Sequence, residues 1–344
     1  MNFPDPPKGK PSWLALSQAV FNLQANRWDK THCNGGLRWQ IFPWNKGYDY
    51  KNSISVGSFF QVAARLARYT GNETYSKWAD ISYDWMIGTD LFTKDYRIYD
   101  GANIAENCSV VAKYQWTYNV GTFLMGAANM YNITKGPTQQ KWRTRVEGLL
   151  NGSEVFFPKE HGGNIMVEVA CEPKASCNYD QPSFKAYLSR WMAATTQLAP
   201  WSYDYIKPKL RDSANGAAGQ CSGGEDGETC GRFWYTTKWD GKKGVGEEMS
   251  ALSVIQSNLI TRVKAPVTQQ KGGTSIGNPS AGSQGDHPQT VTDPYEGHPV
   301  RVVDKAGAGV LTGVVIIGVL GATWWMCFAK DVISEKAPKV SKAQ

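Results

Sequence analysis

Histidine is scarce in this chain, and long runs of one charge sign are missing. Of the 344 residues only four are histidines, and none stands in an HExxH or CxxC-type context that would hold zinc. Lysine and arginine total 37 against 30 acidic residues, but they are spread along the chain instead of forming a basic tract. Because nucleic-acid binding relies on such tracts, we predict no nucleic-acid partner, and we expect no metal site and no cofactor.

A secretory signal peptide is also missing, because the first residues, MNFPDPPKGKPSWLALSQ, contain no apolar stretch of signal length. Six of the seven cysteines nevertheless precede residue 231, and four Asn-x-Ser/Thr sequons accompany them. Disulfides and glycans form in an oxidising, secretory compartment, so we expect the large part of the chain to be extracellular. The predicted glycosylation sites are Asn72, Asn107, Asn132 and Asn151.

The cysteine spacing favours two local disulfides and one long-range disulfide, although spacing alone leaves the connectivity open. The local pairs are Cys171 with Cys177 and Cys221 with Cys230, which leaves Cys33 and Cys108 for each other, while Cys327 lies in an apolar run.

Charged residues make up only 19% of the chain, whereas aromatic residues reach 12%, with 14 tryptophans and 16 tyrosines. A flat aromatic ring covers the apolar face of a sugar, and tyrosine or tryptophan adds a hydrogen-bonding group. The composition is therefore typical of carbohydrate sites, and equally of a tryptophan-rich helical core.

Composition divides the chain into four zones. Residues 1–263 carry helical periodicity and almost all the aromatic residues, whereas residues 264–305 are rich in Gly, Pro, Ser, Thr and Gln. The second zone cannot bury enough apolar surface to order itself, so we predict a flexible stalk. Residues 306–328 contain no charge over 23 positions, about 35 Å of helix, which is enough to cross a hydrocarbon core of about 30 Å.

Residues 329–344 form a short basic tail, and its four lysines favour the cytosolic side of a membrane. We therefore predict that the apolar run is a single transmembrane helix. A glycolipid-anchor signal that is later removed is the alternative, but such signals normally end in the apolar run.

An internal repeat of 64 residues organises the helical zone. Gly57 aligns with Gly121, and Trp78 aligns with Trp142. Each copy predicts a hairpin of two helices, and repeated hairpins stack their apolar faces on neighbouring copies. Long repeats joined by Gly-rich aromatic loops favour a closed α/α barrel over an open solenoid.

The repeat also predicts that the barrel is incomplete. The segment PSWLALSQAVFNLQANRWD aligns through Trp13 with Trp78, so it is expected to be a second helix with no first helix before it. About eight helices are predicted, whereas a closed six-hairpin barrel needs twelve. Together with the missing signal peptide, this indicates a chain truncated at its N-terminus.

Polar and aromatic residues gather where the chain enters the first helix of each hairpin, in GGLRWQ, GYDYKN, YDG, WTYN and NYDQ. A barrel would bring these segments to one mouth, and glycoside hydrolysis needs two carboxyl groups there. The aspartates in these segments are Asp49, Asp100 and Asp180, and each is equally suited to cap a helix or shape a turn.

Two acidic clusters are weaker candidates for a functional site. Glu225, Asp226 and Glu228 are expected in a solvated disulfide loop, with a calcium site as the less favoured alternative. Glu247 and Glu248 open a predicted helix, where acids complement the positive end of the helix dipole.

The chain resembles the fungal branch of glycoside hydrolase family 76 through motifs that occur in order over residues 3–262: YDYKNSIS, GSFFQVAARLARYTGN, YDG, WTYNVGTFLMGAANMYN, CNYDQPSFKAYLSRW and GVGEEMSALSVIQ. This branch comprises endo-α-1,6-mannosidase-like cell-wall proteins of the "defective in filamentous growth" type. The resemblance implies an all-α (α/α)6 six-hairpin barrel and retaining chemistry. It also implies transglycosylation, in which the mannan core of a glycolipid anchor is moved to wall glycan.

Two features depart from that family. Its catalytic pair is two consecutive aspartates upstream of the segment that matches Phe3–Asp29, and no Asp-Asp occurs in this chain. Val56 stands where the family usually has asparagine before Gly57, so one polar group at the mouth is absent. The catalytic residues stay unassigned, and the substrate-binding candidates are Trp39, Tyr50, Asn52, Asp100, Tyr118, Asn119, Asp180 and Gln181.

The favoured function is therefore an endo-1,6-α-mannosidase-like hydrolase or transglycosylase. Its expected partner is α-1,6-linked mannan or a glycolipid-anchor glycan, at the plasma membrane or cell wall. The alternative from a different class is a catalytically inactive, mannan-binding membrane protein. Another α/α-barrel carbohydrate enzyme is a third option, and the oligomeric state is left open.

Overall fold

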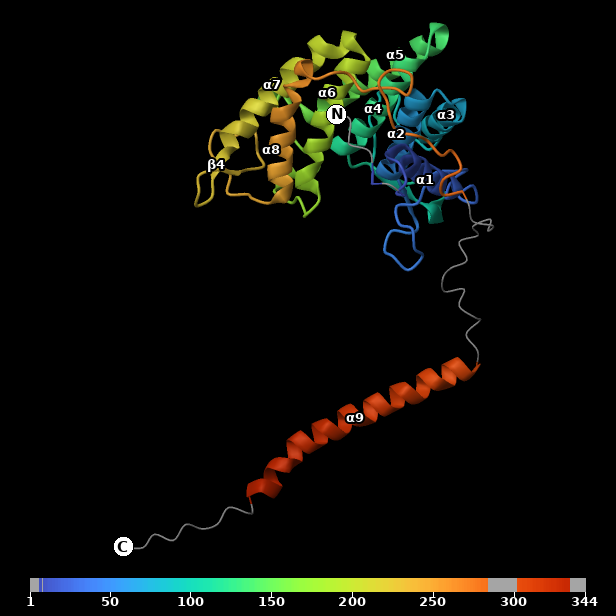
Figure 1. Cartoon of the computed structure of the whole chain (residues 1–344). Coiled ribbons are helices and arrows are strands. Elements are labelled where there is room, and N and C mark those ends of the chain that lie inside the picture. Colours follow the sequence, from blue (N-terminus) through green and yellow to red (C-terminus); the bar gives the residue numbers. More distant parts are fainter. Residues whose placement is uncertain (1–5, 8, 284–301, 335–344) are drawn as a thin grey trace. The chain divides into compact units, whose positions relative to one another are not determined.

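The computed structural model describes residues 6–7, 9–283 and 302–334 (Figure 1). The chain divides into two compact units, Met1–Gly285 and Asp286–Gln344. Among the described residues, the first unit holds eight α-helices and two small sheets, and the second holds one helix. The prediction of a helical domain followed by one apolar helix is confirmed at this level.

Consecutive helices of the first unit pair as hairpins: α2 with α3, α4 with α5, and α6 with α7. The α-helices of this unit are α1 (Trp13–Asn26), α2 (Ser53–Thr70), α3 (Glu73–Gly88), α4 (Thr117–Ile133), α5 (Gly136–Gly152), α6 (Phe184–Leu198), α7 (Tyr203–Gln220) and α8 (Val245–Ser257). Short 3-10 helices are η1 (Ile104–Glu106), η2 (Ser153–Phe156), η3 (Lys159–His161), η4 (Glu172–Lys174), η5 (Gln181–Ser183), η6 (Pro200–Ser202) and η7 (Ile260–Arg262).

The first helices of the hairpins, α2, α4 and α6, form one row that α8 continues, while α1, α3, α5 and α7 pack against that row (Figure 1). Helix α4 lies in the middle of the row, and thirteen of its residues from Thr117 to Met130 are buried. This row is the hydrophobic core of the first unit.

The glycine shared by the two repeat copies has the same role in both. A Cβ on Gly57 of α2 would lie 2.4 Å from Thr122 Oγ1 of α4, and a Cβ on Gly121 of α4 would lie 2.5 Å from the Trp191 ring of α6. Each glycine therefore lets its helix approach the next helix in the row. These equivalent contacts confirm the 64-residue repeat.

The polar segment before α2 explains where this helix begins. Asn52 is the N-cap, because its side chain accepts the backbone N–H of Ser55 at 3.3 Å. Gly71 ends the helix with φ of 73°, a left-handed conformation that glycine adopts without steric cost.

Three short strands join the entries of α2 and α4. They are β1 (Tyr50–Asn52), β2 (Gly101–Asn103) and β3 (Val111–Ala112), and they form an antiparallel sheet in the order β1-β2-β3. In this register Asn52 lies opposite Gly101. The sheet thus brings the segment after Asp100 beside the segment that starts with Tyr50. A second sheet pairs β4 (Cys221–Gly223) with β5 (Thr229–Cys230).

All three predicted disulfides are confirmed. Cys33 bonds to Cys108 across 75 residues of sequence, Cys171 bonds to Cys177, and Cys221 bonds to Cys230. The first of these fastens the loop before β1 to the loop between β2 and β3.

The first part of the segment predicted as a flexible stalk lies against the helical unit. We call residues 264–283 the C-terminal strap. Its backbone accepts hydrogen bonds from Arg68 of α2 and from Asn22 of α1, and its Asn278 N–H donates to Gln18 of α1 at 2.6 Å. A flexible stalk beginning at residue 264 is therefore wrong, because polar side chains of α1 and α2 order a segment that has little apolar surface of its own. Residues 284–301 lie outside the described residues.

The second unit contains α9 (Val302–Ser334). Within it, Lys305–Cys327 is long and apolar enough to cross a membrane, with a mean hydropathy of 2.0, close to the predicted span of residues 306–328. Residues 335–344 of the predicted basic tail lie outside the described residues.

Candidate functional site

Tyr50 and Asp100 form the centre of the candidate site. The Tyr50 hydroxyl donates to Asp100 Oδ2 at 2.7 Å, and the Trp116 side chain hydrogen-bonds to the same carboxylate. Gly101 makes room for this contact, because a Cβ there would lie 2.6 Å from the Tyr50 ring. The sheet therefore joins the entry of α2 to the entry of α4 through a phenol and a carboxylate.

Burial sets the proton affinity of this pair. It raises the pKa of Asp100, and the hydrogen bonds from Tyr50 and Trp116 oppose that rise only in part. Burial, followed by the bond to Asp100, also raises the pKa of Tyr50, so the phenol keeps its proton. A half-buried carboxyl beside aromatic rings can accept hydrogen bonds from sugar hydroxyls.

An aromatic wall lies beside this pair, formed by the entries of α4 and α6. The rings of Tyr118 and Phe184 stack with centroids 3.8 Å apart, and Trp116 meets Phe184 edge to face at 5.6 Å. Burial and then the charge of Asp100 raise the pKa of Tyr118, as do the charges of Glu168 and Asp180. Tyr118 thus lies within electrostatic reach of the carboxyl groups of two entry segments, through Asp100 and Asp180, and of Glu168.

The remaining candidates divide into edge residues and buried residues. Trp39 is 50% exposed and meets Tyr50 edge to face at 6.4 Å. Asp180 is exposed at the start of η5, and Gln181 binds back to the Asn178 N–H. These three lie at the rim of their loops. None of the eight candidates lines the two surface cavities of about 760 and 710 Å³, which lie near Tyr96.

Asn52 and Asn119 are buried and do not reach solvent. Asn52 is engaged as the N-cap of α2, and Asn119 lies in the first turn of α4 with its side-chain amide unpaired among the described residues. Both side chains are buried at the helix entries, and their contact with a sugar stays a prediction. The pattern of polar residues at helix entries in the sequence does not distinguish a capping amide from an exposed one.

A buried charge network beneath the entries of α4, α6 and α8 was not predicted. The Lys185 ammonium lies 2.7 Å from Glu172 and donates to the Arg232 carbonyl, and its nitrogen is 3.8 Å from the Trp234 ring centroid. Arg232 in turn donates to Glu247 of α8 at 3.0 Å through Nε. A lysine among the apolar positions of FKAYLSRW is the sequence pattern that could have indicated this network.

Glu168 caps α4 from outside the helix. It accepts the Thr117 backbone N–H at 3.1 Å and also the Thr117 hydroxyl, and its side chain is fully buried. Burial raises the pKa of Glu168 to about 8, against the opposing effect of the bonds from Thr117. A carboxyl inside the apolar run NIMVEVAC could have been singled out from the sequence, but its partner could not.

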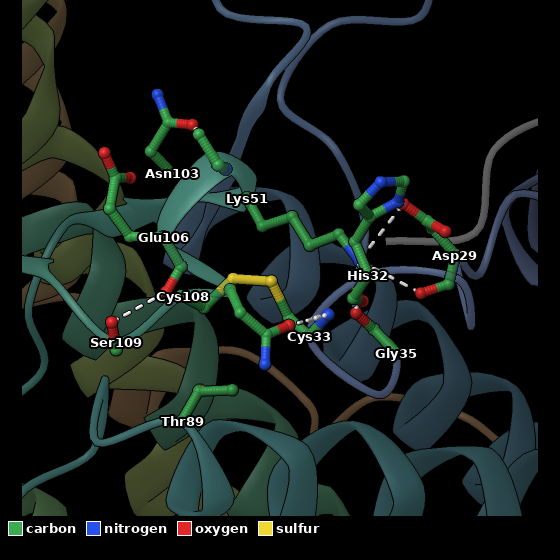
Figure 2. Close-up of a disulfide and its surroundings, with 12 residues drawn as sticks. Asp29, His32, Cys33, Gly35, Lys51, Thr89, Asn103, Glu106, Cys108 and Ser109 are labelled. Atoms are coloured by element: carbon green, nitrogen blue, oxygen red, sulfur yellow. Dashed lines mark hydrogen bonds and ion pairs between the residues drawn. A yellow bond between two sulfur atoms is a disulfide. The ribbon is translucent and has the colours of Figure 1, made fainter.

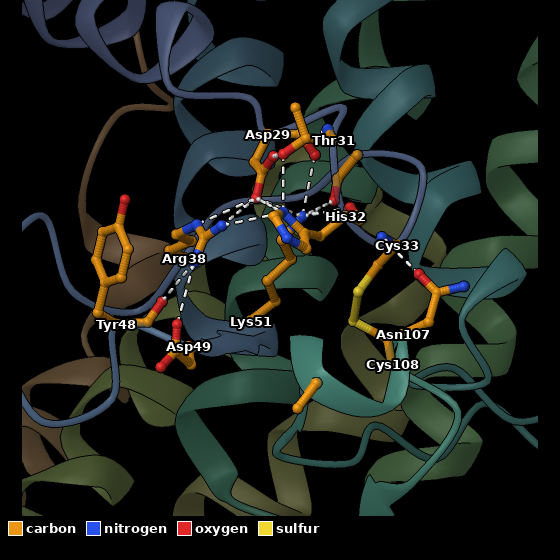
Figure 3. Close-up of polar contacts among 12 residues, drawn as sticks. Asp29, Thr31, His32, Cys33, Arg38, Tyr48, Asp49, Lys51, Asn107 and Cys108 are labelled. Carbon is orange, nitrogen blue, oxygen red and sulfur yellow. Dashed lines mark hydrogen bonds and ion pairs between the residues drawn. A yellow bond between two sulfur atoms is a disulfide. The ribbon is translucent and has the colours of Figure 1, made fainter. Parts of the chain in front are cut away.

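Lys51 fastens the loop that leads into β1. Its ammonium donates to the carbonyl oxygens of Asp29, His32 and Gly35 at 3.0, 2.6 and 2.6 Å. It also lies 3.2 Å from the Asp29 carboxylate, which Arg38 contacts from its other side at 2.9 Å (Figure 3). This loop is further tied by the Cys33–Cys108 disulfide, which lies beside Lys51 (Figure 2).

The Asp29 carboxylate is held in its charged form. Burial alone would raise its pKa, but hydrogen bonds from Thr31 and the charge of Lys51 outweigh burial and leave the pKa well below its usual range. Burial lowers the pKa of Lys51, while Asp29 opposes that decrease. The pair therefore serves as structural support for the loop.

No group of three or more metal-ligating side chains occurs among the described residues. Glu225, Asp226 and Glu228 are exposed in the turn between β4 and β5, where Asp226 accepts the Glu228 N–H at 3.0 Å. All four sequon asparagines, Asn72, Asn107, Asn132 and Asn151, are exposed, and their glycosylation stays a prediction.

Comparison with known proteins identifies relatives of the whole helical unit. The family model described as "Glycosyl hydrolase family 76" matches residues 1–270. Mannan endo-1,6-alpha-mannosidase DCW1 of Candida albicans is 48% identical over 329 residues, which cover 94% of this chain and 71% of the relative. The corresponding DCW1 of Saccharomyces cerevisiae is 47% identical, over 95% of this chain and 71% of its own length.

A solved structure supports the same assignment. Dfg5 from Chaetomium thermophilum, determined in complex with glucosamine, has a TM-score of 0.76 and 43% sequence identity, and the match covers 81% of this chain and 68% of that one. The chain described here therefore belongs to glycosyl hydrolase family 76.

Proposed function

We propose that this chain acts on α-1,6-linked mannan in the fungal cell wall, as part of the endo-1,6-α-mannosidase branch of its family. Relatives that carry that name are 48% and 47% identical to most of the chain. The observation in the structure that carries the proposal is the Tyr50–Asp100 pair beside the stacked rings of Tyr118 and Phe184.

The geometry suits a mannose ring. The aromatic wall offers flat apolar surface for one face of the sugar, and the Asp100 carboxyl offers an acceptor for its hydroxyl groups. Asp180 lies close enough to influence Tyr118 and adds a second acceptor at the rim. We propose Tyr50, Asp100, Tyr118, Trp39 and Asp180 as the sugar-binding residues of this cluster.

We further propose that the row α2, α4, α6 and α8 belongs to the inner ring of an (α/α)6 barrel. Equivalent glycine contacts between successive helices of the row support a repeating ring of this kind. The candidate residues then lie at one mouth, because they all occupy the N-terminal entries of inner helices.

The second candidate function is mannan binding without cleavage. Retaining glycoside hydrolysis needs one carboxyl group as acid and another as nucleophile, and the resemblance assigns these roles to two consecutive aspartates. No two consecutive aspartates occur in these 344 residues. Within the sequence as it stands, we therefore propose that the cluster binds mannan and that no residue shown here can be assigned as the nucleophile.

The three disulfides and the apolar helix support a location at the cell surface. We propose that the first unit lies outside the cytosol and that α9 retains it at the membrane. A glycolipid anchor in place of α9 stays the alternative.

A binding and cleavage assay tests the proposal. The full chain in detergent micelles is titrated calorimetrically with α-1,6-mannotriose, and product release is followed by chromatography. We expect the chain to bind the mannotriose, and released product would support cleavage, whereas binding without release would support the binding-only alternative. Asp100→Asn should weaken binding about tenfold because a charged acceptor is lost. Binding of β-glucan oligosaccharides in preference to the mannotriose would contradict the substrate, and measured cleavage would refute the binding-only alternative.

A further inference from the structure

A loop with exposed aromatic side chains lies next to the candidate site. We call residues 39–48, WQIFPWNKGY, the aromatic loop. At its tip, Phe42 and Trp44 are 41% and 52% exposed, and their rings stack with centroids 4.8 Å apart and 12° between their planes. Large apolar side chains exposed together in this way mark an interaction site more often than isolated ones do.

The tip is held by turns within the loop. The Asn45 N–H donates to the Phe42 carbonyl at 3.0 Å, and the Tyr48 N–H donates to the Asn45 carbonyl at 3.0 Å. The Asn45 side-chain amide also donates to Gln40 Oε1 at 3.4 Å. The stacked rings are therefore presented by ordered backbone, so binding a partner costs little ordering entropy.

The base of the loop is fixed to the candidate site. The Trp39 N–H donates to the Tyr50 carbonyl at 2.7 Å, and the Trp39 ring lies over Gly47, where a Cβ would be 2.4 Å away. The Arg38 guanidinium lies 4.4 Å from the Tyr48 ring centroid while it holds Asp29 (Figure 3). The buried Lys51 contacts and the Cys33–Cys108 disulfide support this base (Figure 2).

The aromatic loop and its neighbour Asp49 combine aromatic, amide and carboxylate side chains. The amides of Gln40 and Asn45 lie between aromatic residues, and the Asp49 carboxylate next to the loop is 70% exposed and 3.5 Å from Arg38. Flat rings with interleaved amide and carboxylate groups match the alternating apolar faces and hydroxyl groups of a sugar chain. Lys46 is exposed within the loop and Asp49 lies beside it, so the loop carries charges of both signs.

We propose that the aromatic loop is an additional binding subsite that holds mannose units of the α-1,6-linked chain beyond those at Tyr50 and Asp100. This inference rests on the proposed function. The path from Trp39 to Tyr50 to Asp100 makes the loop continuous with the central cluster. The loop therefore lengthens the bound segment of polysaccharide, and its effect depends on the length of the oligosaccharide.

The test compares oligosaccharides of two lengths. The full chain in detergent micelles is titrated calorimetrically with α-1,6-mannotriose and with α-1,6-mannohexaose. The double variant Phe42→Ala/Trp44→Ala is expected to bind the hexaose about tenfold more weakly and to bind the triose within about twofold of the unchanged chain. The matched control is Ile81→Ala/Ile87→Ala on α3, which removes two side chains that are 46% and 50% exposed and should change neither affinity.

The outcomes separate the two proposals. If the unchanged chain binds both oligosaccharides and the loop variant binds the hexaose equally well, the subsite is refuted and the proposed function stands. If the unchanged chain binds neither oligosaccharide, the proposed function fails as well. Insertion of the loop into a bilayer is tested by quenching of tryptophan emission with brominated lipids. If the loop inserts, the quenched fraction of the emission will be smaller in Trp44→Ala than in the unchanged chain. This result would overturn the subsite.

Discussion

The Lys185 ammonium and the Glu172 carboxylate lie 2.7 Å apart, and both side chains are almost completely buried beneath the entries of α6 and α8. Removing one partner leaves the other charge in a medium of low dielectric constant. Lys185→Met is expected to lower the free energy of unfolding by about 3–5 kcal/mol. The double variant Lys185→Met/Glu172→Leu should lose much less than the sum of the two single variants, measured by urea unfolding. Additive losses would show that the two groups do not interact.

Lys51 is a second buried ammonium, and its partners are backbone carbonyls as well as Asp29. Lys51→Met leaves three carbonyl groups and one carboxylate without their donor, so we expect a loss of about 3–5 kcal/mol in urea unfolding. Lys46→Met is the matched control, because Lys46 is exposed in the same region, and it should change stability by less than about 0.5 kcal/mol. Equal effects of the two variants would refute the supporting role of Lys51.

Substitutions at the glycines shared by the two repeat copies are expected to change the free energy of unfolding. Gly57→Ala and Gly121→Ala each place a methyl group against the next helix of the row, and each should cost about 1–3 kcal/mol. Gly219→Ala in α7 is the control, because a Cβ there meets no atom within 4 Å, and it should raise stability by about 0.5–1 kcal/mol. Thermal unfolding measures all three, and a stabilising Gly121→Ala would contradict the close packing of α4 on α6.

Glu168 predicts how stability varies with pH. Its pKa of about 8 in the folded chain exceeds the ordinary value of 4.5, so the folded state binds more protons than the unfolded state between these two values. The free energy of unfolding should therefore fall as the pH rises from about 5 to about 8. Glu168→Gln keeps an acceptor for Thr117 and removes this titration, so it should be more stable than the unchanged chain at about pH 8 by at least about 1 kcal/mol. Parallel pH profiles for the two chains would refute the assignment.

The disulfides are expected to differ in their contribution to stability. Chain-entropy arguments assign roughly 4 kcal/mol to the Cys33–Cys108 bond, which closes 75 residues, and roughly 2 kcal/mol to the Cys171–Cys177 bond, which closes 6. Replacing each pair by serine and measuring unfolding should give that order. The reverse order would indicate that the folded-state environment, and not loop closure, governs their effect.

Much of the fold could be predicted from the sequence because its determinants are local. Cysteines that are six and nine residues apart in the sequence have few alternative partners for a disulfide. The recurring glycines and tryptophans show the hairpin repeat directly. Tyr50, Asp100 and Tyr118 were found because polar residues cluster at helix entries, and the structure brings these three together.

The remaining features depend on contacts between distant segments. Lys51 stands in the middle of the predicted entry segment, but its partners at Asp29, His32 and Gly35 come from a separate turn. The C-terminal strap was predicted to be flexible because its composition shows that it has little apolar surface to bury. Composition does not show the hydrogen bonds that Arg68, Asn22 and Gln18 make with the strap. The burial of Asn52 and Asn119 could not be predicted, because a buried amide and an exposed one are the same residue type in the sequence.

The C-terminal strap also determines where a pulling force would act. After α8, the chain passes Tyr69 at the end of α2 and reaches α1, where Gly282 lies against Ala19. Tension applied through the C-terminal segment would therefore load α1 and α2 first, and α8 would bear it only after the strap had been peeled from its hydrogen bonds. The buried Lys185 network, which reaches α8 through Glu247, would therefore carry load only after the strap had separated from α1 and α2.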